Sequence, residues 1–172
     1  MNNTDPTQRR IGQIMLYAAW ALFLGLLTLF FSDYLDRQDN PNRDPASRTS
    51  DGVREVVLQR NRHGHYVATG RINGQPATLL LDTGASLVSV PVALAQRLGL
   101  DYGPPLRART ANGVITVYAT VLERVTVGDI VVRNVRASIN PADDGEVVLL
   151  GMTFMRDLEI SQRGRELTLR QY

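Results

Sequence analysis

The sequence predicts a mainly β domain preceded by one N-terminal transmembrane helix, and three observations support this. The first is an uncharged apolar run at residues 11–31. The second is a change of composition at Val53, after which short β-branched runs alternate with Gly, Asn, Asp and Pro. The third is that only two short segments beyond Val53 carry helix signals. Many short strands with two small helices indicate a predominantly β domain.

The apolar run at residues 11–31 is about 21 residues long, and at about 1.5 Å per residue it crosses a hydrocarbon core of about 30 Å. A cleaved signal peptide has a shorter apolar region, about 7 to 15 residues, and a small-residue cleavage site. This run instead ends in Phe30-Phe31-Ser32-Asp33. We therefore expect an uncleaved signal anchor, with residues 1–10 as a cytoplasmic tail and the following domain on the other side of the membrane.

Residues 32–52 are rich in Asp, Asn, Arg, Pro and Ser and contain almost nothing to bury. This composition predicts a flexible linker between the anchor and a domain at residues 53–172. An exposed linker is also the place where self-cleavage would release the domain.

The strands of this domain are predicted from β-branched and apolar runs bounded by turn residues. Asn73-Gly74 is the strongest hairpin signal, because both of its positions favour positive φ. A helix is expected at residues 91–99, with proline at its start and glycine past its end, and a second at residues 153–158. The predicted strands are Val53–Arg60, Tyr66–Ile72, Thr78–Leu81, a short one after Ser86, Leu106–Thr110, Val114–Val127, Ile130–Ile139, Val147–Leu150 and Glu166–Arg170.

The composition excludes several functional classes. There is no cysteine, so disulfides, thiolate metal sites and a cysteine nucleophile are absent. All 19 basic residues are arginines, and they are interleaved with Asp and Glu to a net charge of +2. A nucleic-acid-binding protein carries a clustered basic stripe instead, so no nucleic-acid partner is expected.

Other polar groups predict turns more readily than sites. His63 and His65 flank a turn glycine and lack neighbouring acidic or cysteine ligands, so we expect no metal and no cofactor. The segment Asp143-Asp144-Gly145 lacks the further oxygen ligands of a calcium loop. Ser86 and Ser89 are possible nucleophiles, but no histidine follows position 65 to activate them.

One carboxylate lies where chemistry is expected. The continuously apolar strand ending at Leu81 runs directly into Asp82-Thr83-Gly84. Asp and Gly are both turn formers, so a tight turn that closes the strand is the simpler interpretation of this triplet. Its surroundings favour a site, because two further segments accompany it: Thr110-Ala111-Asn112-Gly113 and Leu149-Leu150-Gly151.

Residues 80–86, Leu-Leu-Asp-Thr-Gly-Ala-Ser, resemble the active-site motif of retropepsin-like aspartic peptidases. The Thr-Ala-Asn-Gly segment resembles their flap hairpin, and Leu-Leu-Gly-Met resembles the element before their C-terminal helix. The combination is similar to a bacterial group of membrane-anchored members with a single protease domain. The resemblance covers residues 53–172 plus the anchor, and it implies the retropepsin-like barrel, one lobe per chain, in the periplasm beyond a bacterial inner membrane.

The resemblance also implies roles for individual residues. Asp82 would be catalytic and would act with its own copy in a homodimer, because two carboxylates are needed and the chain offers one. Thr83 would bond across the two-fold axis, Gly84 would allow close backbone approach, and Ser86 would support the carboxylate beside Ala85. The remaining implied positions are the flap residues Thr110, Ala111, Asn112 and Gly113, which bind substrate, and Leu149, Leu150 and Gly151, which pack beneath the site.

The function expected from this resemblance is an aspartic endopeptidase that cuts peptide or protein substrates without a cofactor. Two alternatives stay open: a noncatalytic peptide-binding module on the same fold, and a structural envelope protein that assembles with partners. Interleaved chain termini tie retroviral protomers together, whereas here the N-terminal side carries the anchor. The C-terminal strand Glu166–Arg170 is a candidate interface strand.

Overall fold

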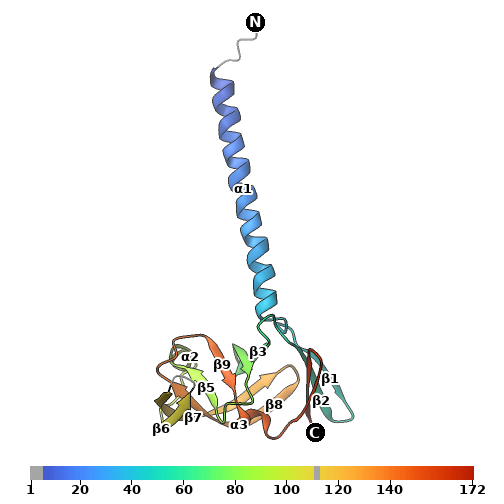
Figure 1. The fold of residues 1–172 in the computed structure, drawn as a ribbon, viewed down its shortest axis with the longest axis vertical. Helices are drawn as coiled ribbons and strands as arrows, with labels where there is room; N and C mark the ends of the chain where they lie inside the picture. Colours follow the sequence, from blue (N-terminus) through green and yellow to red (C-terminus); the bar gives the residue numbers. More distant parts are fainter. Residues whose placement is uncertain (1–5, 111–112) are drawn as a thin grey trace. The chain divides into compact units, whose positions relative to one another are not determined.

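The computed structural model describes residues 6–110 and 113–172 (Figure 1). The chain divides into two compact units, residues 1–38 and 39–172.

The first unit contains helix α1 (Pro6–Asp39) up to residue 38, and this helix includes the predicted apolar span. Its segment Arg10–Asp39 is long and apolar enough to cross a membrane, and no other helix in the described part of the chain is. Apolar side chains are exposed along its length, from Ile11 to Leu35. A helix of this length that is apolar on all sides could cross a bilayer.

The second unit contains two sheets. The smaller sheet is antiparallel throughout, and its strand order is β1-β2-β11-β10. These strands are β1 (Ala46–Ser50), β2 (Val53–Gln59), β11 (Glu166–Gln171) and β10 (Glu159–Arg163). The predicted interface strand at the C-terminus is therefore paired on both of its edges, with β2 and with β10, and is not available to extend the sheet to another chain.

The larger sheet has the order β3-β4-β9-β5-β8-β7-β6, and a further pairing of β3 with β7 closes six of its strands into a barrel. Its strands are β3 (Tyr66–Ile72), β4 (Gln75–Leu81), β9 (Val147–Leu150), β5 (Val88–Pro91), β8 (Ile130–Asn140), β7 (Gly113–Val127) and β6 (Pro105–Thr110). Two short helices, α2 (Val92–Arg97) and α3 (Met152–Met155), complete the unit. The predicted mainly β fold is confirmed.

Alternation along the strands builds one core. In β3 and β4, for example, Ala68, Ile72 and Leu79 are fully buried while their sequence neighbours are not. The hairpin between these strands turns at Asn73 and Gly74 with φ of 51° and 87°, as the sequence predicts. Phe154 of α3 is fully buried in the same cluster, so the segment after β9 is held against the barrel.

The segment predicted as a flexible linker is ordered. Helix α1 continues to Asp39, and β1 pairs along its whole length with β2. Between them, Asn42 is 3% exposed, and its side-chain amide donates to the carbonyls of Gln59 and Val67 at 2.9 and 2.6 Å. Its Oδ1 accepts from the Gln59 N–H at 2.6 Å. One asparagine thus bridges β2 and the start of β3, and the compact unit begins at residue 39 in place of Val53.

Candidate active site

Asp82 follows β4 directly and lies half-buried in a tight turn. Its Oδ1 accepts a hydrogen bond from the Gly84 N–H at 2.9 Å, and its carbonyl accepts one from the Ala85 N–H at 3.2 Å. The Asp82 N–H donates to the Leu150 carbonyl at 3.1 Å. The turn predicted from Asp and Gly is therefore present, and it aims one carboxylate in a defined direction.

A parallel strand pair fixes the position of this turn. β4 and β9 run side by side with Leu81 opposite Leu150, so the chain leaves both strands at the same level. The loop after β4 then bonds the start of α3: the Met152 N–H donates to the Ala85 carbonyl at 2.8 Å, and the Thr153 N–H donates to the Ser86 carbonyl at 3.2 Å. The Leu-Leu-Gly element thus supports the Asp82 loop from below.

Gly151 makes this packing possible. A Cβ at this position would lie 2.3 Å from the Leu87 carbonyl oxygen and 2.6 Å from that of Ala85. Leu150 beside it is fully buried, whereas Leu149 is half-buried and lines the cleft described below. Of the three predicted supporting residues, Leu150 and Gly151 therefore pack beneath the loop, whereas Leu149 faces the cavity.

Thr153 is a supporting residue that sequence reasoning missed. Its side chain is buried; the hydroxyl accepts from the Val88 N–H at 3.1 Å and donates to the Arg136 carbonyl at 2.7 Å. It therefore joins β5 and β8 to α3 behind the Asp82 loop. The sequence indicates this role only through the position of Thr153 two residues after Gly151. That position points to the Asp82 loop only once β9 is known to lie beside β4.

Asp82 borders an open cavity of about 790 Å³ beneath the hairpin of β6 and β7. Ser86 and Leu149 lie on the side of the loop, and Ala108 and Ile115 on the side of the hairpin. Asp82 is the only carboxylate among the described residues that line the cavity. An exposed, mostly apolar groove with one acid at its floor suits an extended peptide.

The other predicted site residues are placed as follows. Thr83, Gly84 and Ser86 are exposed, and within residues 6–110 and 113–172 neither the Thr83 nor the Ser86 hydroxyl is bonded to Asp82. Their roles at a two-fold axis stay predictions. Thr110 and Gly113 close the hairpin with a bond from Thr110 Oγ1 to the Gly113 carbonyl at 3.0 Å. Ala111 and Asn112, the predicted flap tip, lie outside the described residues.

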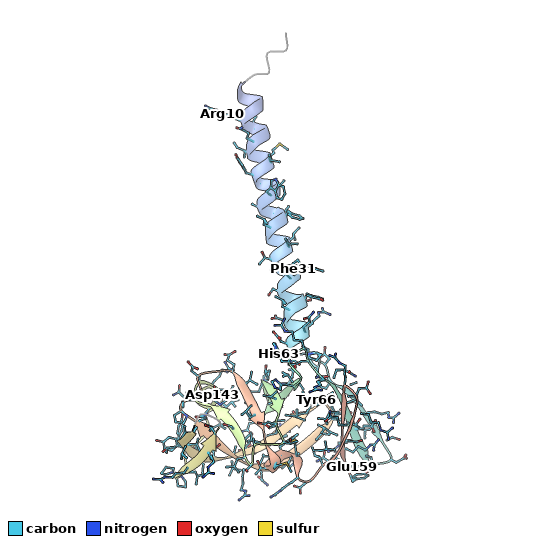
Figure 2. The ribbon with its side chains drawn as sticks, in the orientation of Figure 1. Arg10, Phe31, His63, Tyr66, Asp143 and Glu159 are labelled. Carbon is cyan, nitrogen blue, oxygen red and sulfur yellow. The ribbon has the colours of Figure 1, made fainter. Side chains whose placement is uncertain are left out.

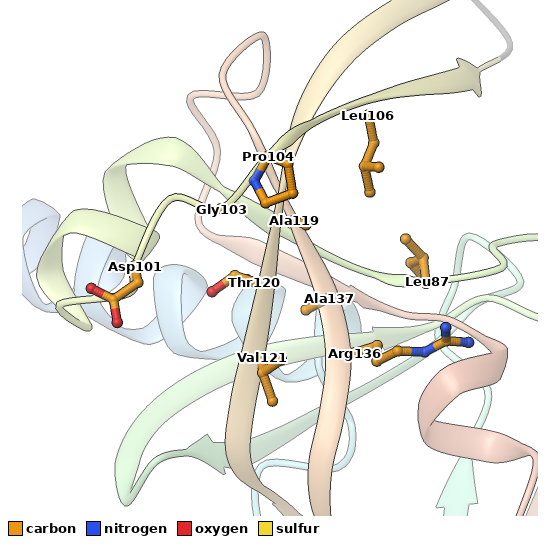
Figure 3. A pocket seen from close by; sticks show the side chains of 10 residues that line it. All are labelled: Leu87, Asp101, Gly103, Pro104, Leu106, Ala119, Thr120, Val121, Arg136 and Ala137. Carbon is orange, nitrogen blue, oxygen red and sulfur yellow. The ribbon is translucent and has the colours of Figure 1, made fainter.

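A second cavity of about 500 Å³ adjoins the first, and Leu87 and Leu106 line both. Figure 3 shows Asp101 on one side of it and Leu87 and Arg136 on the other. Arg136 is exposed, and the described residues include no carboxylate paired with it. The second cavity therefore extends the groove to the guanidinium group of Arg136.

The histidine turn has a different role from the site. His63 Nε2 lies 3.2 Å from Asp39 Oδ1, Arg62 pairs with the same carboxylate at 2.9 Å, and Asn61 donates to the Asp39 carbonyl. Among the described residues no three His, Asp or Glu side chains are grouped closely enough to hold a metal ion. The turn at residues 61–65, which Figure 2 marks with His63, thus holds the first residue of the compact unit.

Comparisons with known proteins agree with this geometry. The family model of the gag-polyprotein putative aspartyl protease matches residues 68–157, a span from β3 to α3 that contains Asp82. Among solved structures, a retropepsin-like aspartic protease from Rickettsia conorii is similar, with a TM-score of 0.59 and 25% identity. The match covers 74% of this chain and 96% of that chain.

Two curated relatives are uncharacterized proteins. One, from the cobV 5′ region of a Sinorhizobium species, is 34% identical over 134 residues, which is 76% of this chain and 58% of the relative. The other, from Rickettsia prowazekii (strain Madrid E), is 25% identical over 131 residues, which is 74% of this chain and 56% of the relative. The chain thus spans less than two thirds of either relative.

Proposed function

Because the chain belongs to the gag-polyprotein putative aspartyl protease family, whose fold is retropepsin-like, we propose that it is an aspartic endopeptidase with an active site built from two copies of Asp82. The observation that carries the proposal is the half-buried Asp82 on the floor of a cleft of about 790 Å³. That cleft holds no second carboxylate among its described lining residues. A second copy supplies the missing acid most simply, across a two-fold axis.

The proposed reaction needs one proton shared between the two carboxyl groups. The ionised carboxylate takes a proton from water, whose oxygen attacks the peptide carbonyl carbon, while the protonated carboxyl gives its proton to the carbonyl oxygen. The C–N bond of the tetrahedral adduct then breaks as its nitrogen takes up the first proton. A hydroxyl of the adduct returns the second proton, and the pair is restored.

The substrate lies extended between the Asp82 loop and the β6–β7 hairpin, bonded through its main chain as an added strand. We further propose that α1 anchors the enzyme once in a bacterial inner membrane, with residues 1–10 in the cytoplasm and the protease in the periplasm. Self-release within residues 32–52 is not part of this function. The segment is helical to Asp39, Asn42 is then held by hydrogen bonds of its side chain, and β1 is paired with β2. Cleavage requires an extended, accessible chain instead.

The test is cleavage of a diverse peptide library by the full chain in lipid vesicles, between about pH 4 and 7. We expect cleavage that a statine-type inhibitor blocks. If dimers form under these conditions and no peptide is cut, the noncatalytic peptide-binding module becomes the better explanation.

Arg136 is expected to set part of the substrate preference. It borders the second cavity without a carboxylate partner in the described part of the chain, so an acidic substrate side chain that reaches this cavity gains a charge pair. We expect Arg136→Glu to lower kcat/KM for such acidic peptides about tenfold, or ~1.4 kcal/mol, and to favour their basic counterparts. Peptide pairs that differ only in this charge measure the effect.

Arg133→Glu is the matched control. Arg133 lies on the same strand, is also exposed, and lines neither cavity. An equal change of preference in both variants would point to a general field of the domain and count against a specific contact at Arg136.

A further inference from the structure

The second cavity carries two opposite charges. Asp101 and Arg136 are the charged residues among the described residues that line it, and both are exposed. Within residues 6–110 and 113–172, neither side chain forms an ion pair. Figure 3 shows them on opposite sides of the cavity. The cavity therefore offers one acid and one base at separate places.

The backbone on both sides of Asp101 is held by the fold. Leu100 is buried, and its N–H donates to the Ala95 carbonyl at 3.0 Å. The Gly103 N–H donates to the Ala119 carbonyl at 2.8 Å, and a Cβ at Gly103 would lie 2.7 Å from that carbonyl oxygen. The carboxylate is therefore presented from a fixed backbone although it is exposed.

The backbone of Arg136 is fixed as well. Arg136 lies in β8, opposite Val121 of β7. Its carbonyl accepts a hydrogen bond from the Thr153 hydroxyl at 2.7 Å, which joins it to α3. Since α3 also bonds the Asp82 loop, the base of the second cavity and the acid of the cleft belong to one connected framework.

The two charges lie at different depths along the groove. Leu87 and Leu106 line both cavities, so the second cavity joins the cleft at these residues. In Figure 3, Arg136 lies on the side of Leu87 and Leu106, and Asp101 lies on the far side. A chain that extends outward from the cleft therefore passes Arg136 before it reaches Asp101.

We propose that the second cavity binds a charge pair of the substrate, with an acidic side chain at Arg136 and a basic side chain at Asp101, two residues farther from the scissile bond. In an extended chain, residues two apart point to the same face and lie about 7 Å from one another, so one cavity can take both. The proposal rests on the proposed function and narrows its substrate class. It adds to the preference for an acid at Arg136 a second charge and an order.

The two-fold symmetry of the proposed site extends this order to the whole substrate. Each half of the substrate meets one such cavity, so the acid is nearer the scissile bond on both sides and the base is farther. We call this arrangement the mirrored order. Exchanging the two charges gives the reversed order, in which a base faces Arg136 and an acid faces Asp101. Both contacts are then repulsive, which discriminates more strongly than the loss of an attraction alone.

The test compares peptides of equal composition and net charge that differ only in this order. The charge pair is moved outward stepwise from the scissile bond, and the full chain is assayed in lipid vesicles near neutral pH, where acidic side chains of peptides are ionised. We expect kcat/KM to be about tenfold higher for the mirrored order at the best spacing. Asp101→Arg combined with Arg136→Glu exchanges the charges of the cavity, so this double variant should prefer the reversed order.

Glu123→Arg combined with Arg133→Glu is the matched control. Both residues are exposed, lie on β7 and β8, and line neither cavity. This exchange leaves the net charge unchanged, as the exchange in the cavity does, and it should keep the preference of the wild type. An inverted preference in the control, or an unchanged preference in the cavity variant, overturns the proposal.

Binding separates this inference from the proposed function. Fluorescence anisotropy of labelled peptides measures binding to the full chain and to Asp82→Asn, and both should bind the mirrored order more tightly. Cleavage that depends on Asp82 but shows no order preference at any spacing overturns the charge-pair cavity and leaves the proposed function standing. Tighter binding of the mirrored order without any cleavage by the wild type supports the cavity and removes the proposed function.

Discussion

Asp82→Asn is expected to lower kcat by at least about 10³-fold while KM changes little. An amide cannot take the proton of the attacking water, and both copies in a dimer lose this capacity. The fold should survive, because the amide oxygen can still accept the Gly84 N–H bond that Oδ1 accepts at 2.9 Å. Thermal unfolding of the variant checks that its stability is retained.

A mixing experiment with this variant tests whether two chains build one site. In an equal mixture with wild type at a density where all chains pair, random exchange leaves a quarter of the dimers fully wild type, so activity per wild-type chain falls to about half. Asp144→Asn, in an exposed turn outside both cavities, is the matched control and should leave activity unchanged. Activity that is unaffected by added Asp82→Asn chains would place a complete site in one chain.

The strands of the barrel could be predicted because their signals are local. Tyr66–Ile72 and its return strand are β-branched and apolar runs joined by a turn that only certain residues favour, and the structure confirms both strands and the turn. The position of Asp82 was also predictable, since it depends on a short contiguous motif. The resemblance to retropepsin-like proteases is confirmed by the family match and by the fold.

The two strands that the sequence did not predict, β1 and β10, depend on contacts between residues that are distant in sequence. β1 reads Ala-Ser-Arg-Thr-Ser and is exposed throughout, so no apolar pattern indicates it. It forms because β2 offers an edge and Asn42 holds the preceding chain against Gln59 and Val67. β10 is likewise short and polar. Composition alone therefore predicts a linker in the first case and indicates no strand in the second.

The contacts of β9 and α3 that support the Asp82 loop could be predicted from the sequence only in part. The sequences before Asp82 and before Gly151 resemble each other, and the structure shows the reason: β4 and β9 are parallel neighbours with matching ends. This register is a tertiary property, so neither the buried hydroxyl of Thr153 nor the position of Leu149 in the cleft follows from local sequence. The function of a residue after β9 becomes visible only when the strand beside it is known.

Gly151→Ala is expected to lower the free energy of unfolding by at least ~3 kcal/mol, or to prevent folding. The cost is steric, because Gly151 has an ordinary extended backbone with φ of −86°. The added Cβ would meet two carbonyl oxygens, of Leu87 at 2.3 Å and of Ala85 at 2.6 Å. Backbone atoms cannot rotate away as a side chain can, so the loop itself must shift.

That loop carries Asp82, so Gly151→Ala is expected to lower kcat together with the free energy of unfolding. Any folded Gly151→Ala protein must displace residues 85–87 from α3, which breaks the bonds that hold the loop in register, and its kcat should fall with its stability. Gly145→Ala is the control, since its added Cβ would meet only the movable Asp143 carboxylate, at 3.0 Å. Chemical denaturation followed by circular dichroism compares the two. If both variants unfold at the same denaturant concentration as the wild type, the close packing of the two parallel strand ends does not hold the Asp82 loop.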